Sequence, residues 1–497
     1  MEYIPTIGLE IHAELLTASK MFCSCRNNPD ETRPNVDVCP ICLGHPGTLP
    51  VLNLEAIRKV LQVGLAIEGQ LADFTEWDRK NYFYPDIPKG YQISQFKYPL
   101  VSGGNLSNVE VERIHLEEDT AQSTHDQHNK SLVNFNRSGR PLMELVTKPV
   151  IHDAKTAANF AKNLQLLLRY LGAGEANMEK GQMRIEANIS VAPVGSQTLG
   201  TKTEVKNLNS FRSVEKAIEY EIDRQTSLLK GGDKIVQETR GWDDANQETY
   251  SQRSKESSHD YRYFPEPDIP KLKLSEIAEF NPAILKNDLP ELPWVKRDRY
   301  ENDYKMTDKE VAVFVENQEV AKYFEEIISH FKGDAKKIKL TVNYLLNNYL
   351  GKIYLGSTEN NRTVDVDEQI NIDPISAKSF AELIDLIYDK TISSTGASTL
   401  IDIALQSKSG FKGSFKAEAE QNNLIQKSDA ADLVPAIEKI IADNAKVVTE
   451  FKNGKTASLQ FLIGQAMKAT KGSANPEVVK KLLIEKITRS DLVEKPS

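Results

Sequence analysis

The chain has 497 residues, of which 40% are hydrophobic and 27% charged, a balance typical of soluble globular proteins, and its length predicts several domains. Its formal net charge of −9 excludes a protein coated with basic surface for bulk nucleic-acid binding. The sequence has no run of about 18 apolar residues and no basic segment followed by an apolar one at its start, so we expect no membrane span, no secretory signal and a cytoplasmic location.

The first predicted strand covers residues 7–14. Side chains of a strand alternate between its two faces, so one face is apolar and the other carries Gly8, Glu10, His12 and Glu14. An amphipathic strand with a solvated outer face would explain this pattern without any function.

The four cysteines lie close together, as Cys23, Cys25, Cys39 and Cys42. A protein stabilised by disulfides would spread its cysteines along the chain. Four thiolates in a short loop can instead surround Zn²⁺ tetrahedrally. We therefore expect a structural zinc ion in the loop 23–42, with free buried cysteines as the alternative. Such a metal does no chemistry, because four protein ligands close its coordination shell.

Further acids follow in other alternating segments. Residues 113–119 end in three consecutive acids, and Glu144 stands in an apolar context. In the predicted strand 182–191, Arg184 and Glu186 share the polar face. If these strands are neighbours, several carboxylates and a histidine converge on one sheet face and repel one another. A hard divalent cation such as Mg²⁺ would relieve that repulsion, so we hypothesise a magnesium site.

No standard phosphate-binding loop is present. Residues 195–203 have one residue too many before Lys202 to match the P-loop pattern, and residues 172–177 lack the third glycine of a dinucleotide-binding motif. ATP would need a different cradle. The candidate cations for it are Arg79, Lys80, Lys89, Lys202 and Lys206.

Two helices are predicted in the first part of the chain. One starts at its capping residue Asp153 and ends near Leu171, and the other covers residues 213–229. Proline-rich stretches at 264–270 and 289–293 mark the end of a mixed α/β domain over residues 1–293. Residues 294–405 and 406–497 both have helical patterns. The predicted class is therefore α+β, with an α/β domain, an all-helical domain and a small helical tail domain.

Longer motifs resemble one family, the B subunits of the aspartyl/glutamyl-tRNA(Asn/Gln) amidotransferases, or GatB family. The matching segments follow one another in the family's order and span most of the chain. They are IGLEIHAEL (7–15), RKNYFYPD (79–86), KGYQISQ (89–95), KTEVKNLNSF (202–211), HDYRYFP (259–265), GQAMKATKG (464–472) and ANP (474–476).

The resemblance implies a heterotrimeric, glutamine-dependent ligase in which a chain of this family supplies a cradle-like catalytic domain. That domain uses ATP and Mg²⁺ to phosphorylate the side-chain carboxylate of Glu-tRNA(Gln) or Asp-tRNA(Asn). An amidase partner hydrolyses glutamine to ammonia, which displaces the phosphate, and a small third subunit holds the pair together. Acyl-phosphate chemistry suits the polar strand faces, because two anions must meet and be neutralised.

The resemblance also implies site residues. Mg²⁺ ligation falls on His12, Glu118 and Glu144, with Glu10 and Glu186 nearby, although strict alternation favours Glu117 over Glu118. For the nucleotide, the candidate cations named above stay the expectation from the residues themselves. The tail carries Lys468, Lys471, Lys480, Lys481 and Lys486 among apolar positions. The resemblance implies that they contact tRNA phosphates, against the simpler interpretation of solvated helix faces.

The chain departs from the family's usual residues at three positions. Glu186 replaces an aspartate, Asn134 a frequent aspartate and Gln122 a common lysine. These changes affect the fine geometry of the site. The cysteine pattern occurs in only part of the family, so zinc is an addition and not a requirement.

Two other functions stay open. One is a zinc-stabilised RNA-binding paralogue without catalysis. The presence of all of Glu10, His12, Glu118 and Glu144 argues against it. The other is a stand-alone carboxylate–amine ligase that uses free ammonia, which the tail argues against. The sequence has no Ser-Ser-Lys centre, so we expect glutamine hydrolysis to belong to a partner. It does not distinguish Glu-tRNA from Asp-tRNA.

Overall fold

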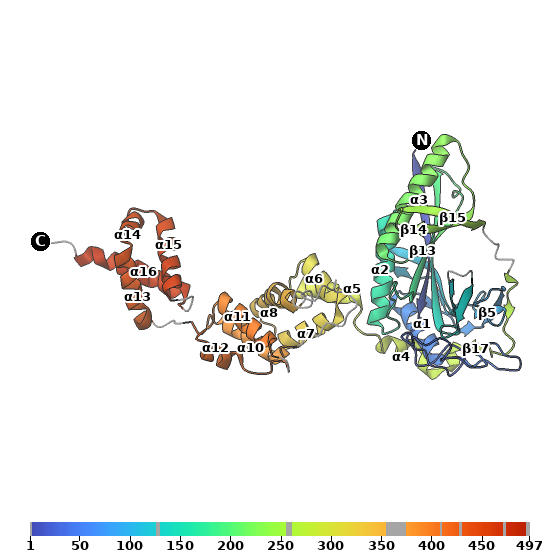
Figure 1. Cartoon of the computed structure of the whole chain (residues 1–497), viewed down its shortest axis with the longest axis horizontal. Helices are drawn as coiled ribbons and strands as arrows, with labels where there is room; N and C mark the ends of the chain where they lie inside the picture. Colours follow the sequence, from blue (N-terminus) through green and yellow to red (C-terminus); the bar gives the residue numbers. More distant parts are fainter. Residues whose placement is uncertain are drawn as a thin grey trace. The chain divides into compact units, whose positions relative to one another are not determined.

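The computed structural model describes residues 2–125, 130–254, 261–353, 374–407, 410–426, 430–470 and 474–493. The chain forms two compact units, Met1–Pro293 and Trp294–Ser497. The first contains all the named strands and the second is helical, so the predicted α+β class is confirmed (Figure 1). A further division between residues 405 and 406 stays a prediction.

A ten-stranded sheet organises the first unit. Its order is β15-β14-β13-β12-β1-β11-β8-β6-β2, with β7 paired to β8, and only β13 and β14 pair in parallel. Its central strands are β1 (Tyr3–Glu14), β11 (Pro141–Thr147), β8 (Val109–Glu118) and β12 (Met183–Pro193). The outer ones are β13 (Thr203–Leu208), β14 (Glu238–Asp243), β15 (Glu248–Ser254), β6 (Val101–Ser102), β2 (Gln70–Leu71) and β7 (Asn105–Leu106).

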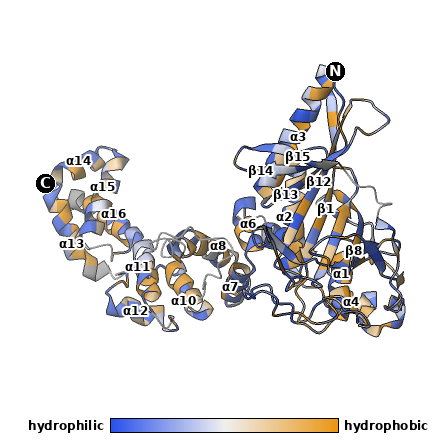
Figure 2. Ribbon diagram, turned by 45° about the vertical axis from the view of Figure 1, so that its right-hand side comes forward, coloured by the Kyte–Doolittle hydropathy of each residue, from blue (hydrophilic) through white to orange (hydrophobic). Residues whose placement is uncertain are grey.

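One face of this sheet is the core of the unit. The apolar positions of β1, Ile7, Leu9, Ile11 and Ala13, are at most 1% exposed. They lie under the helices α1 (Leu54–Ala66), α2 (Ala154–Tyr170) and α3 (Phe211–Gly231), of which α2 and α3 run along one side of the strands in Figure 1. The hydropathy colouring of these helices alternates along the ribbon, as expected for helices with one buried face (Figure 2).

The helix ends follow local capping chemistry. The side chains of Asn53, Asp153 and Ser210 accept hydrogen bonds from the first backbone N–H groups of α1, α2 and α3. The helix predicted from Asp153 is confirmed. The one predicted over 213–229 is two residues longer at each end, because Ser210 caps its start and Gly232, with φ 86°, ends it.

A small sheet faces the other side of the large one. It consists of β16 (Phe264–Pro265), β4 (Asp78–Asn81) and β5 (Tyr91–Ser94), in that order. Two further pairs are β9 (Gln122–His125) with β10 (Ser131–Asn134), and β3 (Phe74–Thr75) with β17 (Leu272–Lys273). The short helices η2 (Leu274–Glu276), η3 (Ala278–Phe280) and α4 (Pro282–Asn287) complete the unit.

The second unit is built from helices. They are α5 (Pro293–Asp303), α6 (Asp308–Glu316), α7 (Gln318–Ser329), α8 (Ala335–Tyr344), the short π-helix η4 (Leu345–Leu350), α10 (Ala377–Tyr388), α11 (Ser394–Leu405), α12 (Phe415–Gln421), α13 (Ala430–Asp443), α14 (Ala445–Lys452), α15 (Thr456–Ala469) and α16 (Pro476–Val493). The last four share a core that includes Leu433, Leu462, Val479 and Leu483. Among the described residues, no helix is long and apolar enough to cross a membrane.

Candidate functional site

The polar face of the large sheet brings acids and histidines together. The strand β11 lies between β1 and β8, and Glu144 is paired in register with His12 on one side and His115 on the other. Its Oε2 lies 3.3 Å from Nε2 of each imidazole. Glu117 adds a second carboxylate, whose Oε1 is 3.8 Å from Nε2 of His12. Glu10 is the fifth member, at 4.0 Å from the same nitrogen.

Mutual charge dominates this cluster. Burial would lower the pKa of His12, but its hydrogen bond to Glu144 and the nearby carboxylates outweigh burial and raise the pKa to about 9. The pKa of His115 is raised to about 9 against the same opposing burial, by Glu144 and Glu117. Burial opposes ionisation of Glu144 as well, yet the charges and hydrogen bonds of the two imidazoles hold its pKa well below the usual value. The carboxylates therefore favour a positive charge at the position of each imidazole.

A second acidic group adjoins the first across β1, β12 and β13. Carboxylate oxygens of Glu10, Glu186 and Glu204 lie within 4.8 Å of one another. Lys206 partly neutralises them, with its Nζ 2.7 Å from Oε2 of Glu186. Burial, followed by the charges of Glu144 and Glu186, raises the pKa of Glu10. Glu10 thus belongs to both groups.

A divalent cation fits these donors. Carboxylate oxygens and an imidazole nitrogen from Glu10, His12 and Glu144, or from His115, Glu117 and Glu144, lie within 4.8 Å of one another. Oε2 of Glu117 and Nδ1 of His115 are buried and make no hydrogen bond to any described residue. Hard oxygen donors with one imidazole suit Mg²⁺ or Mn²⁺.

The cluster forms the floor of a cavity of about 620 Å³. The opposite wall comes from β4, β5 and the segment before β16, and it contributes Lys80, Tyr82, Phe96, Tyr261 and Tyr263. The ammonium group of Lys80 lies 5.1 Å from the centroid of the Tyr261 ring. The cavity therefore offers an acidic floor and a basic, aromatic wall.

The five candidate nucleotide-binding cations do not gather in one place. Lys80 and Lys206 line the cavity. Arg79 forms a two-pronged ion pair with Glu266, at 2.6 and 2.7 Å, and lines a second cavity together with Lys89. Lys202 is exposed and lines neither cavity. The structure thus brings only two of the five to the acidic cluster.

Glu118 lies outside the cluster, contrary to the placement that the family resemblance implied. Its side chain faces the second cavity, where it pairs with Lys89 and accepts a hydrogen bond of 2.9 Å from the backbone N–H of Ile93. The physical reason is strand alternation. The register of β8 shifts near Glu112, upstream of the acids, and continues regularly from Arg113 to Glu118. Glu117 therefore shares the face of His115, as strict alternation predicts.

The cysteine loop is compact. The Sγ atoms of Cys23, Cys25, Cys39 and Cys42 lie within 4.8 Å of one another, and none of the four forms a disulfide. Fully buried Lys20 lies beneath them, with its Nζ 3.8 Å from Sγ of Cys42 and 2.6 Å from the carbonyl oxygen of Asp37. A tetrahedral zinc ion fits four such thiolates.

The remaining predicted residues belong to the second unit. Lys468 on α15 and Lys480 and Lys481 on α16 are exposed. Lys471 lies outside the described residues, as do residues 259 and 260 of the fifth motif.

The interpretation of the sequence missed two members of the site. His115 stands two residues before Glu117 on the same strand face, and Glu204 stands two residues before Lys206. Alternation within each strand was a signal for both. Its weakness is that every amphipathic strand gives the same signal.

The sequence is similar to known proteins over nearly its whole length. A family model described as the GatB/GatE catalytic domain matches residues 5–278, and one described as the GatB domain matches residues 322–487. Relatives from Thermodesulfovibrio yellowstonii, Caldicellulosiruptor saccharolyticus and a Picosynechococcus species are 42%, 41% and 40% identical. Each alignment covers 98% of this chain and 99%, 100% and 98% of the respective relative. All three bear the name of the B subunit of an aspartyl/glutamyl-tRNA(Asn/Gln) amidotransferase.

Proposed function

This chain belongs to the GatB family of aspartyl/glutamyl-tRNA amidotransferase subunits, and from that premise we propose that its cavity phosphorylates the side-chain carboxylate of Glu-tRNA(Gln) or Asp-tRNA(Asn) at the expense of ATP. Ammonia then replaces the phosphate and gives the amide. The ammonia comes from a glutaminase partner, and a small third subunit supports the pair. The observation that carries the proposal is the meeting of Glu10, His12, Glu117 and Glu144 in one cavity.

The reaction has two steps. A carboxylate oxygen of the substrate forms a bond to the γ-phosphorus of ATP, the bond from that phosphorus to the bridging oxygen breaks, and ADP leaves. Ammonia then bonds to the acyl carbon, inorganic phosphate leaves, and a proton passes from nitrogen to a base. The first step needs two anions to approach each other, so its barrier is largely electrostatic.

The residues of the cavity suit that barrier. His12, Glu117 and Glu144, with Glu10 and Glu186 beside them, would hold Mg²⁺, which neutralises phosphate charge when bound. Lys80 and Lys206 bring cationic nitrogen to the same cavity and can bind anionic oxygens of the substrates. The rings of Tyr82 and Tyr263 line the wall opposite the carboxylates and limit the access of water, which would otherwise hydrolyse an acyl phosphate.

The competing interpretation as a non-catalytic RNA-binding paralogue finds no support in this geometry. A chain that only binds RNA has no use for several carboxylates forced together beneath a cavity. Burying so many ionisable groups costs desolvation free energy, and RNA binding alone does not require it.

The substitution Glu144→Gln tests the proposal directly. We expect phosphate release from radiolabelled ATP by the reconstituted complex to require a mischarged tRNA, and Glu144→Gln to reduce that release by about 100-fold or more, because one cation ligand is lost. Binding of tRNA should stay within about twofold. Glu110→Gln is the matched control, since Glu110 lies on β8 but is exposed and paired with Lys148.

Two results would contradict the proposal. One is unchanged phosphate release in Glu144→Gln, and the other is release that does not depend on mischarged tRNA. Running the assay in parallel with Glu-tRNA(Gln) and Asp-tRNA(Asn) also identifies the substrate.

A further inference from the structure

Aromatic rings form a continuous wall over the acidic floor. Tyr82, Tyr261 and Tyr263 follow one another with ring centroids 6.0 and 6.1 Å apart. Phe96 stacks on Tyr263, with centroids 4.4 Å apart and an interplanar angle of 9°. All four rings line the cavity.

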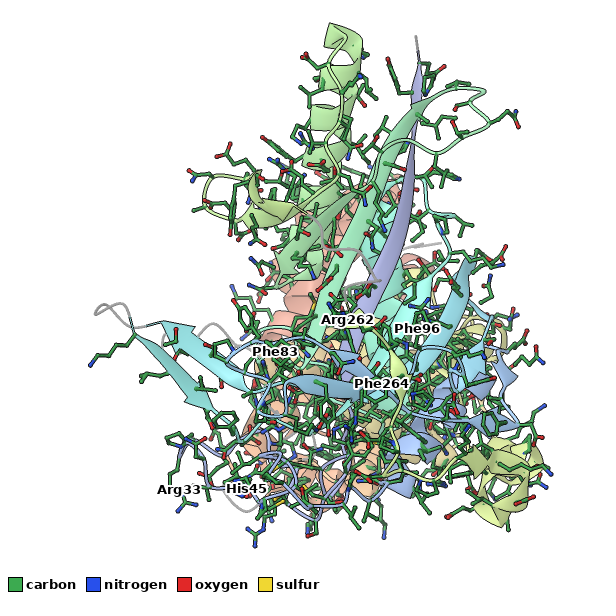
Figure 3. All side chains as sticks on the ribbon, turned by 90° about the vertical axis from the view of Figure 1, so that its right-hand side faces the viewer. Arg33, His45, Phe83, Phe96, Arg262 and Phe264 are labelled. Atoms are coloured by element: carbon green, nitrogen blue, oxygen red, sulfur yellow. The ribbon has the colours of Figure 1, made fainter. Side chains whose placement is uncertain are left out.

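The end ring of this wall, Phe96, is open to solvent. Phe96 is 58% exposed although Tyr263 covers one of its faces, so its other face is free. Phe83 and Phe264 do not line the cavity, but they add exposed rings to the same unit, with 90% and 44% exposure. Figure 3 looks onto this side of the unit and shows Phe83, Phe96 and Phe264 in front of the large sheet. Large apolar rings grouped in water mark an interaction site more often than chance exposure.

Cations alternate with these rings. Arg262 lies between Tyr261 and Tyr263 in the chain, and its side chain is exposed (Figure 3). Lys97 follows Phe96 and is also exposed, while Lys80 lies over the ring of Tyr261. Rings that accept stacked bases, interleaved with cations that follow a phosphate backbone, are the usual construction of sites for single-stranded nucleic acid.

We propose that this aromatic wall, from Phe96 and Tyr263 through Tyr261 to Tyr82, stacks the unpaired nucleotides at the 3′ end of the tRNA substrate. The inference rests on the proposed function. The reacting amino acid is esterified to the ribose of the last nucleotide, so its carboxylate reaches Glu144 only if that nucleotide enters the mouth of the cavity. The terminal bases must then lie against the cavity wall, and the described wall opposite the sheet is aromatic.

The number and position of the rings favour the tRNA end over the adenine of ATP. One adenine stacks on one or two rings inside a cavity. The wall has four rings in a row, and its end ring Phe96 is 58% exposed, which is more than an enclosed nucleotide pocket leaves open. A run of several rings matches several consecutive bases.

Binding measurements that combine side-chain substitutions in the protein with a shortened tRNA test the proposal. The full chain, in its reconstituted complex, is titrated with uncharged tRNA that is either intact or lacks its last three nucleotides. We expect Phe96→Ala to weaken binding of the intact tRNA by about tenfold, the loss typical of one base–aromatic stack, and to leave binding of the shortened tRNA unchanged. Phe96→Tyr keeps an aromatic ring at this position and should bind the intact tRNA as wild type does.

Tyr250→Ala is the matched control. Tyr250 is an aromatic residue of β15 with 44% exposure, and it does not line the cavity. It should not discriminate between the two tRNAs. Because Phe96 is largely exposed, its replacement should leave the fold intact, which circular dichroism can check.

Three results would overturn the proposal. Wild-type protein would bind both tRNAs equally, or Phe96→Ala would weaken both equally, or Phe96→Ala would raise the KM for ATP and preserve the preference for intact tRNA. The last result assigns the rings to the nucleotide. Failure of the proposed function itself looks different, because wild-type protein would then release no phosphate with mischarged tRNA whatever the binding measurements show.

Discussion

Glu117 and Glu118 are adjacent in the chain but serve different environments. Glu117 faces the imidazoles of His12 and His115, whereas Glu118 pairs with Lys89 on the opposite face of β8. A pleated strand separates neighbouring side chains in this way whenever its register is regular. Replacing each of these two acids should therefore affect a different property of the protein.

Binding of Mn²⁺ or Mg²⁺ distinguishes these two acids. We expect Glu117→Gln to weaken cation affinity by at least about tenfold in calorimetric titration, because a carboxylate donor of the cluster becomes a neutral amide. Glu118→Gln should leave the affinity within about twofold. It should instead reduce the free energy of unfolding by about 3 kcal/mol, since a buried ammonium loses its partner. Loss of cation binding in Glu118→Gln alone would reverse the assignment.

Lys20 gives the cysteine loop a second testable feature. It is fully buried, and its ammonium group lies against Sγ of Cys42 and donates to the carbonyl oxygens of Asp37 and Phe135. Four thiolates around Zn²⁺ carry a net charge of −2, so a nearby cation stabilises the complex. Lys20→Met keeps the approximate length of the side chain and removes its charge.

We expect Lys20→Met to lose zinc to a competing chelator at about tenfold lower chelator concentration than wild type. Zinc content is measured by elemental analysis after equilibration. Lys180→Met serves as the control, because Lys180 is exposed and pairs only weakly with Asp30, at 3.4 Å. Equal zinc retention in both variants would show that the charge of Lys20 plays no part.

The site could be predicted from the sequence only as far as local rules reach. Alternation alone places Glu10 with His12, and it favours Glu117, the acid that the structure places beside His12, over the family-based choice of Glu118. Which of the two acids binds Mg²⁺ stays a prediction. No local rule reveals that β11 lies between β1 and β8, which is what brings Glu144 between His12 and His115. Such pairing depends on contacts between distant segments. For the same reason the sequence did not separate Lys80, which lines the cavity, from its neighbour Arg79, which does not.

Two helices, α1 and α15, each contain a glycine, but packing requires only one of these glycines. A Cβ atom on Gly64 of α1 would lie 2.5 Å from Cγ2 of Val101, so α1 approaches β6 too closely for any side chain. A Cβ atom on Gly464 of α15 would meet nothing within 4 Å. The first glycine is required by packing and the second is not.

Alanine at these two positions should therefore change stability in opposite directions. We expect Gly64→Ala to lower the free energy of unfolding by about 1–3 kcal/mol through overpacking against the stiff valine side chain. Gly464→Ala should raise it by up to about 1 kcal/mol, because alanine favours the helix. Hydrogen–deuterium exchange of peptides from α1 and α15 reports each helix separately. Stabilisation by Gly64→Ala would contradict the close approach of α1 and β6.

Helices were more predictable than sheet order. The limits of α2 follow from Asp153, a helical run of apolar residues and Gly172, all within about 20 residues of sequence. The sheet order combines strands from both ends of a unit of nearly 300 residues, and local patterns contain no information about that order. Each strand is therefore predictable on its own, whereas the convergence of the strands follows only from their register.

For the whole molecule, net charge is a poor guide to where nucleic acid binds. The chain is acidic, with a formal charge of −9, yet a large share of its carboxylates is engaged in local pairs such as Glu266 with Arg79 or Glu221 with Arg224. Exposed cations on a few helices can dominate the local potential within about one Debye length, roughly 8–10 Å at physiological salt. A tRNA partner is thus compatible with an acidic protein.

The exposed lysines of the tail provide the corresponding prediction. If Lys468, Lys480 and Lys481 contact tRNA phosphates, each contact releases condensed counterions on binding. Replacing all three by alanine should lower tRNA affinity and reduce the slope of log affinity against log salt by about 0.7–0.9 per lost contact. Turnover at saturating tRNA should be unchanged, because the acidic cavity is untouched. Binding of fluorescently labelled tRNA at several salt concentrations measures both quantities.

Lys486 supplies the control within the same helix. It carries the same charge on α16, but its ammonium group is 2.6 Å from a carboxylate oxygen of Glu438. A lysine already neutralised by a carboxylate releases few counterions from a phosphate, so Lys486→Ala should leave the salt slope unchanged. If the triple variant and Lys486→Ala lowered the slope equally, the effect would be one of general charge and not of specific contacts. If neither changed it, these lysines would be solvated helix faces, and the tRNA would have to be held by other parts of the chain or by its partners in the complex.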